Sequence, residues 1–235
     1  MRLAHSAWPD IADKPTVLVP IGSIEQHGPH LPFDTDSVIA VAVAQGVAGH
    51  VEGSVVAPPI MYGSSGEHQM FPGTCSIGSA ALQMMLVELV RSMRTWAGQV
   101  VFVNAHGGNL TALVAAVTQM RGEGHDSAWI PCATEDIDLH AGLTETSLML
   151  HLRPESVQLN RAEPGNTCSL QEILPLLMAE GVGAVSANGI LGDPAGADAD
   201  RGARLLGRMI ADTTGAVLDG TVDARGRLSP HATVS

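Results

Sequence analysis

The chain has 235 residues, of which 45% are hydrophobic and 3% aromatic, which suits one α/β domain with a real core and excludes a disordered chain. Its formal net charge is −12 and its twelve basic residues form no run, which argues against nucleic acid and anionic membranes as partners. No apolar run could span a bilayer and Met1–Asp10 lacks a signal-peptide core, so we expect a cytoplasmic protein.

Short β-branched runs alternate with longer helical patterns along the chain. This alternation, with continuously apolar strands, predicts a mainly parallel sheet covered by helices on both faces, a three-layer α/β/α fold. The last nineteen or so residues are polar, so we expect a poorly ordered tail on a single domain of residues 1–235. In chain order, the sequence predicts a strand at Thr16–Ile21, a helix at Ser37–Val51, a strand at Ser54–Ile60, a helix at Ser79–Trp96, a strand at Gln99–Val103, a helix at Leu110–Glu123, a weaker strand at Ala128–Ala133, and helices at Ser169–Glu180 and Arg201–Val217.

A segment rich in acidic and histidine side chains, Gly22–Asp36 (GSIEQHGPHLPFDTD), follows the first predicted strand. Glu25 and His27 are two residues apart, so their side chains point to the same side of an extended segment. The chain then turns through proline-containing steps and brings Asp36 to the start of a helix. Carboxylate oxygens with imidazole nitrogen suit Zn²⁺, Mn²⁺ or Fe²⁺. The alternative is a helix cap within a polar loop, which is the better interpretation for Asp34 taken alone.

The segment Val103–Asn109 (VNAHGGN) ends the clearest strand in a glycine-rich turn and enters a helix that Asn109 can cap. His106 lies at the strand tip, where ligands gather in parallel sheets. An incidental histidine in a strand–helix turn is the alternative. The spacing is not that of a phosphate-binding loop, because no Gly-Lys-Thr or Gly-Lys-Ser follows.

The segment Asp136–Leu150 (DIDLHAGLTETSLML) adds a further histidine and three acidic residues. Glu145 opens an apolar stretch, so we expect it near a helix N-terminus, where the helix dipole favours the ionised form that a metal ligand requires. His140 precedes it by five residues, and Asp136 and Asp138 add carboxylates. The alternative for Glu145 is that it caps its own helix.

The long loop Met61–Gly78 contains Glu67 and His68 and is interpreted as a pocket wall or a subunit contact. Both residues could contact the metal ligands without binding the metal themselves, or they could lie at the surface or an interface. The role of His30 is equally open. Three widely spaced cysteines predict no disulfide framework. Together, these segments place acid and imidazole groups at one end of the predicted sheet, which predicts a metal site.

Four motifs in order, GSxEQHGPHLPxxTD, SSGEHxxFPGT, NxHGGN and HAGxTETSxML, resemble the creatininase (creatinine amidohydrolase) family across most of the chain. The resemblance implies a creatininase-like fold, a homo-oligomer such as a hexamer, and two divalent metal ions per chain, Zn²⁺ or Fe²⁺ with Mn²⁺ as another option. Asp36 would bridge the two ions. By position in the motifs, the implied ligands are Glu25, Asp36 and His106 for one metal, and His27, Asp36 and Glu145 for the other.

His140 matches the position of the family's catalytic flap histidine, which implies that it moves a proton to the leaving amine. Gly108 stands where creatininase itself has a glutamate, which weakens the case for creatinine as the substrate and leaves Glu145 as the replacing ligand. The stretch Arg161–Arg201 resembles a peptide-cleaving branch of the family. That resemblance implies a small modified precursor peptide, cut near its C-terminus to release a Val–Tyr-derived piece for redox-cofactor biosynthesis.

Two alternatives remain open. One is a family amidohydrolase that acts on a small cyclic amide or a formamide. The other is a non-catalytic metal-binding or assembly protein, against which the complete set of five ligand-type residues and His140 argues.

Overall fold

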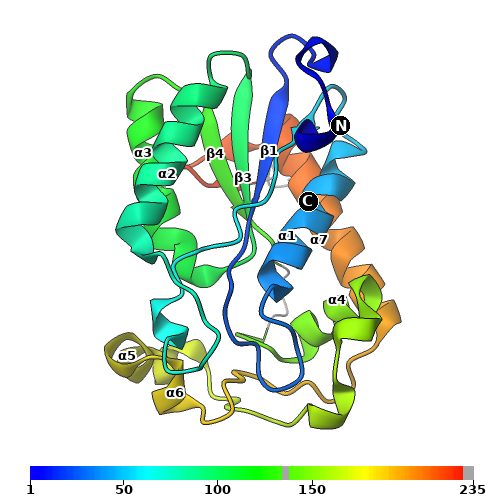
Figure 1. The fold of residues 1–235 in the computed structure, drawn as a ribbon, viewed down its shortest axis with the longest axis vertical. Coiled ribbons are helices and arrows are strands. Elements are labelled where there is room, and N and C mark those ends of the chain that lie inside the picture. The colour runs from blue at the N-terminus through cyan, green and yellow to red at the C-terminus, as the bar shows by residue number, and fades with distance from the viewer. Residues whose placement is uncertain (134–137, 230–235) are drawn as a thin grey trace, which may run out of the picture.

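The computed structural model describes residues 1–133 and 138–229, and its centre is a four-stranded parallel sheet (Figure 1). The strand order is β2-β1-β3-β4, and the long central pair β1 and β3 runs in register from Thr16 opposite Gln99 to Ile21 opposite Asn104. All four strands therefore end at the same edge of the sheet. Their bounds are Thr16–Ile21 for β1, Val55–Val56 for β2, Gln99–Asn104 for β3 and Ser127–Pro131 for β4.

Helices cover both faces of this sheet, so the predicted three-layer α/β/α fold is confirmed (Figure 1). Because side chains alternate along a strand, Val100 and Phe102 of β3 pack toward one face, and Val101 and Val103 pack toward the other. The first face is covered by α2 (Gly78–Met93) and α3 (Leu110–Gly122), and the second by α1 (Thr35–Ala48) and α7 (Ala199–Asp219).

Most predicted elements are present with small shifts at their ends. The clearest difference is the strand predicted over Ser54–Ile60, which shortens to β2, Val55–Val56. Pro58 and Pro59 have no backbone N–H to donate, so the ladder stops before them, and Ile60 makes only an isolated bridge to Ile21.

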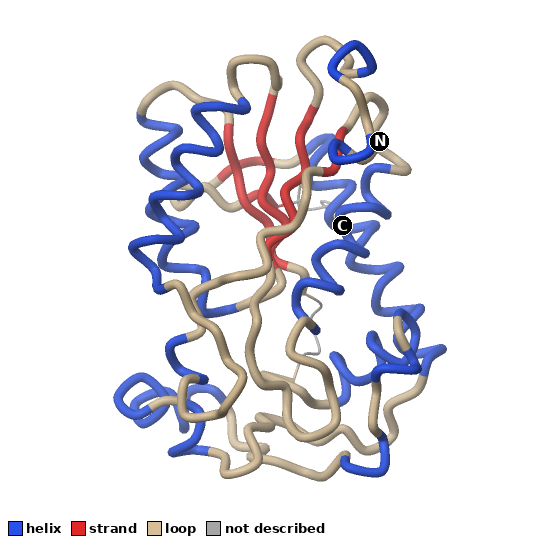
Figure 2. Tube along the Cα trace, viewed as in Figure 1, coloured by secondary structure: helices blue, strands red, loops and turns tan. Residues whose placement is uncertain are grey.

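Beyond the ends of the strands, the lower half of the molecule in Figure 2 consists mainly of loops with a few helices. These helices are α4 (Leu143–Leu152), α5 (Leu170–Glu180) and α6 (Val182–Val185). At the start of α5, Ser169 and Glu172 form a reciprocal capping box, and at its end Gly181 adopts φ +81°, which favours glycine. Short 3-10 turns occur at Leu3–His5, Trp8–Asp10, Gly66–His68, Gly107–Asn109, Pro154–Ser156 and Leu159–Arg161.

Within the tail for which the sequence predicts little order, the structure describes a small antiparallel hairpin of β5 (Thr221–Val222) and β6 (Leu228–Ser229). Leu228 is buried against the α7 face of the core, and the Trp129 indole donates a hydrogen bond to the Arg225 carbonyl. Residues 230–235 lie outside the described residues. Among the helices that the structure describes, none has the length and apolar character needed to cross a membrane.

Candidate metal centre

The sheet brings the predicted site residues together at its carboxyl edge. The segment after β1 carries Glu25 and His27, and α1 begins immediately beyond it and carries Asp36 in its first turn. Gly22 allows this arrangement, because a Cβ at that position would overlap the backbone and side chain of Ser37. His106 follows β3, and Glu145 lies in the first turn of α4.

A cavity of about 880 Å³ opens onto this cluster. Its floor is formed by the acidic and imidazole groups, and one wall is apolar and comes largely from α5. The described lining residues include no lysine or arginine. The cluster residues that line it are Glu25, Asp36, His68, His106, His140 and Glu145, and the apolar wall includes Met70, Leu139, Leu170, Leu174, Leu177 and Met178.

Glu25 is a fully buried carboxylate, and imidazole nitrogens lie close to both of its oxygens. His106 Nε2 lies 3.1 Å from Oε2 and His68 Nε2 lies 3.4 Å from Oε1, yet among the described residues neither oxygen accepts a hydrogen bond of good geometry. A buried carboxylate without hydrogen bonds costs free energy unless a cation compensates it. Glu25 therefore fits the role of a metal ligand.

Asp36 lies between two imidazoles, one on each of its oxygens. Its Oδ1 is 3.2 Å from His27 Nε2, and its Oδ2 is 3.4 Å from His106 Nδ1. The Ser23 hydroxyl donates a 2.7 Å hydrogen bond to Oδ2 and fixes the carboxylate. A carboxylate held in this way can present one oxygen to each of two ions.

The His27 ring is oriented by the backbone. Its Nδ1 lies 3.1 Å from the Glu25 carbonyl oxygen, which can only accept, so Nδ1–H donates. Nε2 then faces Asp36 and, at 3.9 Å, Glu145 Oε2. Metal-binding histidines commonly use one nitrogen for the ion and anchor the other in this manner.

Glu145 is held by the turn that precedes its helix. Ala141 adopts a left-handed conformation with φ 54°, and its N–H donates a 2.6 Å hydrogen bond to Glu145 Oε2. Asp138 does not join the cluster, because its carboxylate accepts from the Thr144 N–H and caps α4. Asp136, which the sequence analysis named beside it, lies outside the described residues.

His140 and His68 extend the imidazole cluster. The His140 ring is tilted against that of His27, with centroids 4.4 Å apart, and its centroid lies 4.5 Å from that of His68. His140 Nε2 is 2.8 Å from the Gln26 carbonyl oxygen, which leaves Nδ1 directed toward Glu25 Oε1 at 3.9 Å. Sequence reasoning left His68 open and did not consider Gln26. The sequence feature that could have pointed to Gln26 is its position between Glu25 and His27.

The surroundings of Gly108 leave no space for a side chain. A Cβ at residue 108 would overlap the Ser64 carbonyl oxygen, the Glu67 carboxylate and His106 Nε2. Glu67 thus occupies the space beside the glycine, with Oε1 3.6 Å from His106 Nε2. This residue, left open by the sequence, lies at the edge of the cavity.

Two other acidic or imidazole residues of the first motif have structural surroundings. The Asp34 carboxylate pairs with Arg153 at 2.9 Å, at the surface and away from the cluster. His30 is buried and its Nε2 lies 2.9 Å from the Thr146 hydroxyl. Burial lowers the pKa of His30 to about 4, so its ring is neutral at pH 7.

The protein without metal balances its buried carboxylates with protonated histidines. Burial alone would raise the pKa of Glu25, but its interactions with His106 and the charge of His68 together outweigh that effect and lower the pKa to about 2. Burial opposes charging of His27, yet Asp36 raises its pKa to about 10, and Glu25 raises that of His106 well above its usual value. The burial of Glu145 raises its pKa to about 7.

The donor set fits a divalent metal. Three groups of acid and imidazole residues present ligand atoms within 4.8 Å of one another: Glu25, His27 and Asp36; His27, His140 and Glu145; and Glu25, His68 and His140. Mixed carboxylate and imidazole ligands suit Zn²⁺, Mn²⁺ and Fe²⁺. His106 is absent from these three groups, and it directs Nε2 toward Glu25 and Nδ1 toward Asp36.

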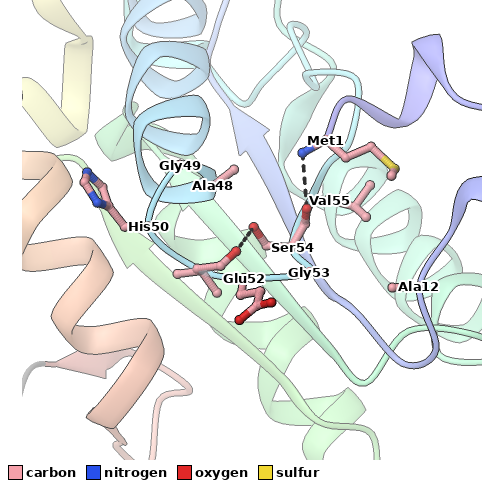
Figure 3. Close-up of a pocket in the computed structure, with 10 residues that line it drawn as sticks. Met1, Ala12, Ala48, Gly49, His50, Glu52, Gly53, Ser54 and Val55 are labelled. Carbon is pink, nitrogen blue, oxygen red and sulfur yellow. Dashed lines mark hydrogen bonds between the residues drawn. The ribbon is translucent and has the colours of Figure 1, made fainter.

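A second hollow, of about 420 Å³, lies at the opposite end of the sheet, where α1 leads into β2 (Figure 3). Its polar groups bond to one another. The Met1 amino group donates to the Ser54 carbonyl oxygen, and the Ser54 hydroxyl donates to that of Val51. His50 and Glu52 also line this hollow, but none of the predicted site residues does.

The chain is similar in sequence and in fold to known proteins. The chain is 53% identical over 201 residues to the mycofactocin precursor peptide peptidase of Mycolicibacterium smegmatis, with 83% of this chain and 81% of the relative covered. It is 49% identical over 207 residues to the protein of the same name from Mycobacterium tuberculosis, with 84% and 82% covered. A solved structure titled "Creatininase Mn" superposes with a TM-score of 0.77 at 25% identity, covering 92% of this chain and 96% of that one.

The family model described as creatinine amidohydrolase matches residues 4–217, which span the sheet, the helices on both its faces and every residue of the cluster. The chain therefore belongs to the creatininase family.

Proposed function

We propose that this protein is a metal-dependent peptide hydrolase that cleaves a modified mycofactocin precursor peptide near its C-terminus. The cut would release the Val–Tyr-derived piece that is used in redox-cofactor biosynthesis. The observation that carries the proposal is the 53% identity to a relative named mycofactocin precursor peptide peptidase, combined with a buried acid and imidazole cluster at the floor of one cavity.

We propose two metal positions that share Asp36. Glu25, Asp36 and His106 would hold one ion, and His27, Asp36 and Glu145 the other. The two oxygens of Asp36, each facing a different imidazole, support this arrangement. The solved structure titled "Creatininase Mn" makes Mn²⁺ a candidate beside Zn²⁺ and Fe²⁺.

A pair of divalent ions in such a site supplies Lewis-acid polarisation of an amide carbonyl and makes water nucleophilic at neutral pH. The protein's own groups then have separate tasks. Ser23 fixes Asp36, and the Glu25 carbonyl fixes the His27 ring. The Gln26 carbonyl holds Nε2 of His140, whose other ring nitrogen is directed toward Glu25 in the lining of the cavity. From that position, His140 can carry a proton to the departing amine.

The cavity wall supports an organic substrate with apolar side chains. Leu174 and Met178 of α5 are 42% and 78% exposed and line the same cavity as the cluster. Burying such side chains against a ligand is favourable by about 25 cal/mol per Å² of apolar surface. A volume of about 880 Å³ lies within the size range of small-ligand pockets.

The experiment combines metal analysis with mass spectrometry of a mycofactocin-type precursor peptide incubated with wild type and with Asp36→Ala. About two metals per chain and cleavage near the C-terminus are expected for wild type, and both are lost in the variant. Asp34→Ala is the matched control, because Asp34 pairs with Arg153 at the surface, and it should keep both properties.

Other outcomes of that experiment separate the alternatives. Two bound metals without peptide cleavage would favour a hydrolase of a small cyclic amide or formamide, and direct assay of such amides would then show activity. Two metals with no hydrolysis of any amide would favour a binding or assembly protein. No bound metal in wild type would refute the metal site itself.

We also propose that the protein works in the cytoplasm as a homo-oligomer, such as a hexamer. Exposed apolar side chains on the helices, including Met84 of α2 at 69% exposure, support association. Light scattering coupled to size-exclusion chromatography gives the mass directly. A monomer mass of 24.3 kDa at micromolar concentration would contradict the proposal.

A further inference from the structure

The side-chain amide of Gln26 is held in one orientation by two backbone groups. Its Oε1 lies 2.8 Å from the Gly28 nitrogen, which can only donate, and its Nε2 lies 3.0 Å from the Gly189 carbonyl oxygen, which can only accept. The amide is also tightly packed, because a Cβ at Gly189, where φ is +80°, would overlap it. The oxygen and nitrogen of this amide therefore cannot exchange places without losing both bonds.

The second hydrogen on Nε2 of Gln26 has one available acceptor. His68 Nδ1 lies 2.9 Å away and His140 Nε2 lies 3.2 Å away. His140 Nε2, however, is 2.8 Å from the Gln26 carbonyl oxygen and must carry its own hydrogen to donate there. The amide hydrogen therefore goes to His68, and Nδ1 of His68 is an unprotonated acceptor.

An imidazole that accepts at Nδ1 carries its proton on Nε2. In His68, this nitrogen faces Glu25 Oε1 at 3.4 Å, one of the two carboxylate oxygens that lack a hydrogen bond among the described residues. The same Nε2 is the atom that a metal would need, so its proton conflicts with direct binding of an ion by His68.

We propose that Gln26 fixes His68 in the Nε2–H tautomer, so that His68 donates to Glu25 and orients this carboxylate instead of binding a metal itself. Gln26 and His68 are then positioning residues of the site. The role of His68 in hydrolysis rests on the proposed function, but its tautomer and its effect on metal affinity do not.

The first test reads the tautomer directly. In zinc-loaded wild type labelled with ¹⁵N-histidine, long-range proton–nitrogen correlation should show His68 with Nδ1 unprotonated and Nε2 protonated. His68→Gln identifies the signal by its loss. In Gln26→Glu, the new carboxylate oxygen accepts instead of donating, so the proton of His68 should move to Nδ1. A protonated Nδ1 in wild type would overturn the proposal.

The second test separates positioning from metal ligation. His68→Met removes the donor at similar size, whereas His68→Gln keeps an amide N–H near Glu25. We expect both variants to bind the wild-type number of metals at saturation. His68→Met should weaken metal affinity by about 10- to 100-fold, as outer-shell changes do, and His68→Gln should recover part of that loss. Loss of one metal per chain in both variants would show that His68 is a ligand.

These readouts keep the two proposals distinct. If no peptide or amide is hydrolysed but the tautomer and affinity results hold, the proposed function fails and the positioning role stands. If the peptide is cleaved but His68 behaves as a ligand, the positioning role fails alone.

Discussion

Metal binding to this protein should release protons, and the affinity should therefore rise with pH. His27 has a pKa of about 10 in the metal-free protein, so its ring is protonated at pH 8. A metal can use Nε2 only after that proton leaves. Removing it two pH units below the pKa costs about 2.7 kcal/mol, at about 1.4 kcal/mol per unit.

The sign and size of the effect follow from this cost. Below pH 10, each unit of increase removes about 1.4 kcal/mol from the cost, which is tenfold in affinity for one proton released. Between pH 7.0 and 8.5, the release of the His27 proton alone should raise the metal affinity roughly 30-fold. Despite burial, Glu25 holds the pKa of His106 well above its usual value. Metal binding should therefore release a second proton from His106, which also makes the affinity rise with pH.

Calorimetric titration with Zn²⁺ in buffers of different ionisation enthalpy counts the protons released, and competition with a chelator gives the affinity at each pH. His27→Gln should release about one proton fewer than wild type. The control is His50→Gln, an exposed residue at the opposite end of the sheet, which should leave the count unchanged. Stoichiometric binding at pH 7.5 without proton release would refute the protonated state assigned to these histidines.

Three further predictions concern packing around the same centre. Gly108→Ala places a methyl group against His106 and should lower both metal content and melting temperature; wild-type metal content would contradict the overlap. Ser23→Ala removes the donor to Asp36 and should cost about 1.5–3 kcal/mol in urea unfolding of the metal-free protein, a loss that would be absent if solvent replaces the hydroxyl. Phe102→Ala leaves a cavity in the core beneath α2 and α3, and should lower the free energy of unfolding by about 3–5 kcal/mol without changing metal stoichiometry. A loss below about 1 kcal/mol would show that neighbouring side chains fill the cavity.

The local pattern of the sequence was enough to predict the layers of the fold. The predicted strands Thr16–Ile21 and Gln99–Val103 each contain a continuous apolar run rich in β-branched residues. Such runs are typical of strands buried on both faces, so they predict a parallel sheet. The same reasoning located the motifs after β1 and β3, because ligands gather at the carboxyl edge of such sheets. The strand at β2 was predicted with too late an end, because the β-branched residues at its start were given more weight than the two prolines that follow.

The tertiary structure alone decided which polar residues share the centre. Asp34 and Asp36 are two residues apart in one motif, yet one pairs with Arg153, 119 positions away, and the other lies among the buried imidazoles. Asp138 instead caps α4, because its carboxylate accepts a hydrogen bond from the Thr144 N–H. Such outcomes depend on how loops cross one another in space, which short-range periodicity does not encode.

The contact between Gln26 and His68 shows the same division. The sequence placed Glu25 and His27 on one side of an extended segment and thereby determined the chemistry of the site. It could not show that Gln26, which lies between them, meets a histidine 42 positions further along the chain and a carbonyl oxygen at Gly189. Residue types determine which bonds are chemically available, and only the packed fold determines which donors and acceptors come within reach of one another.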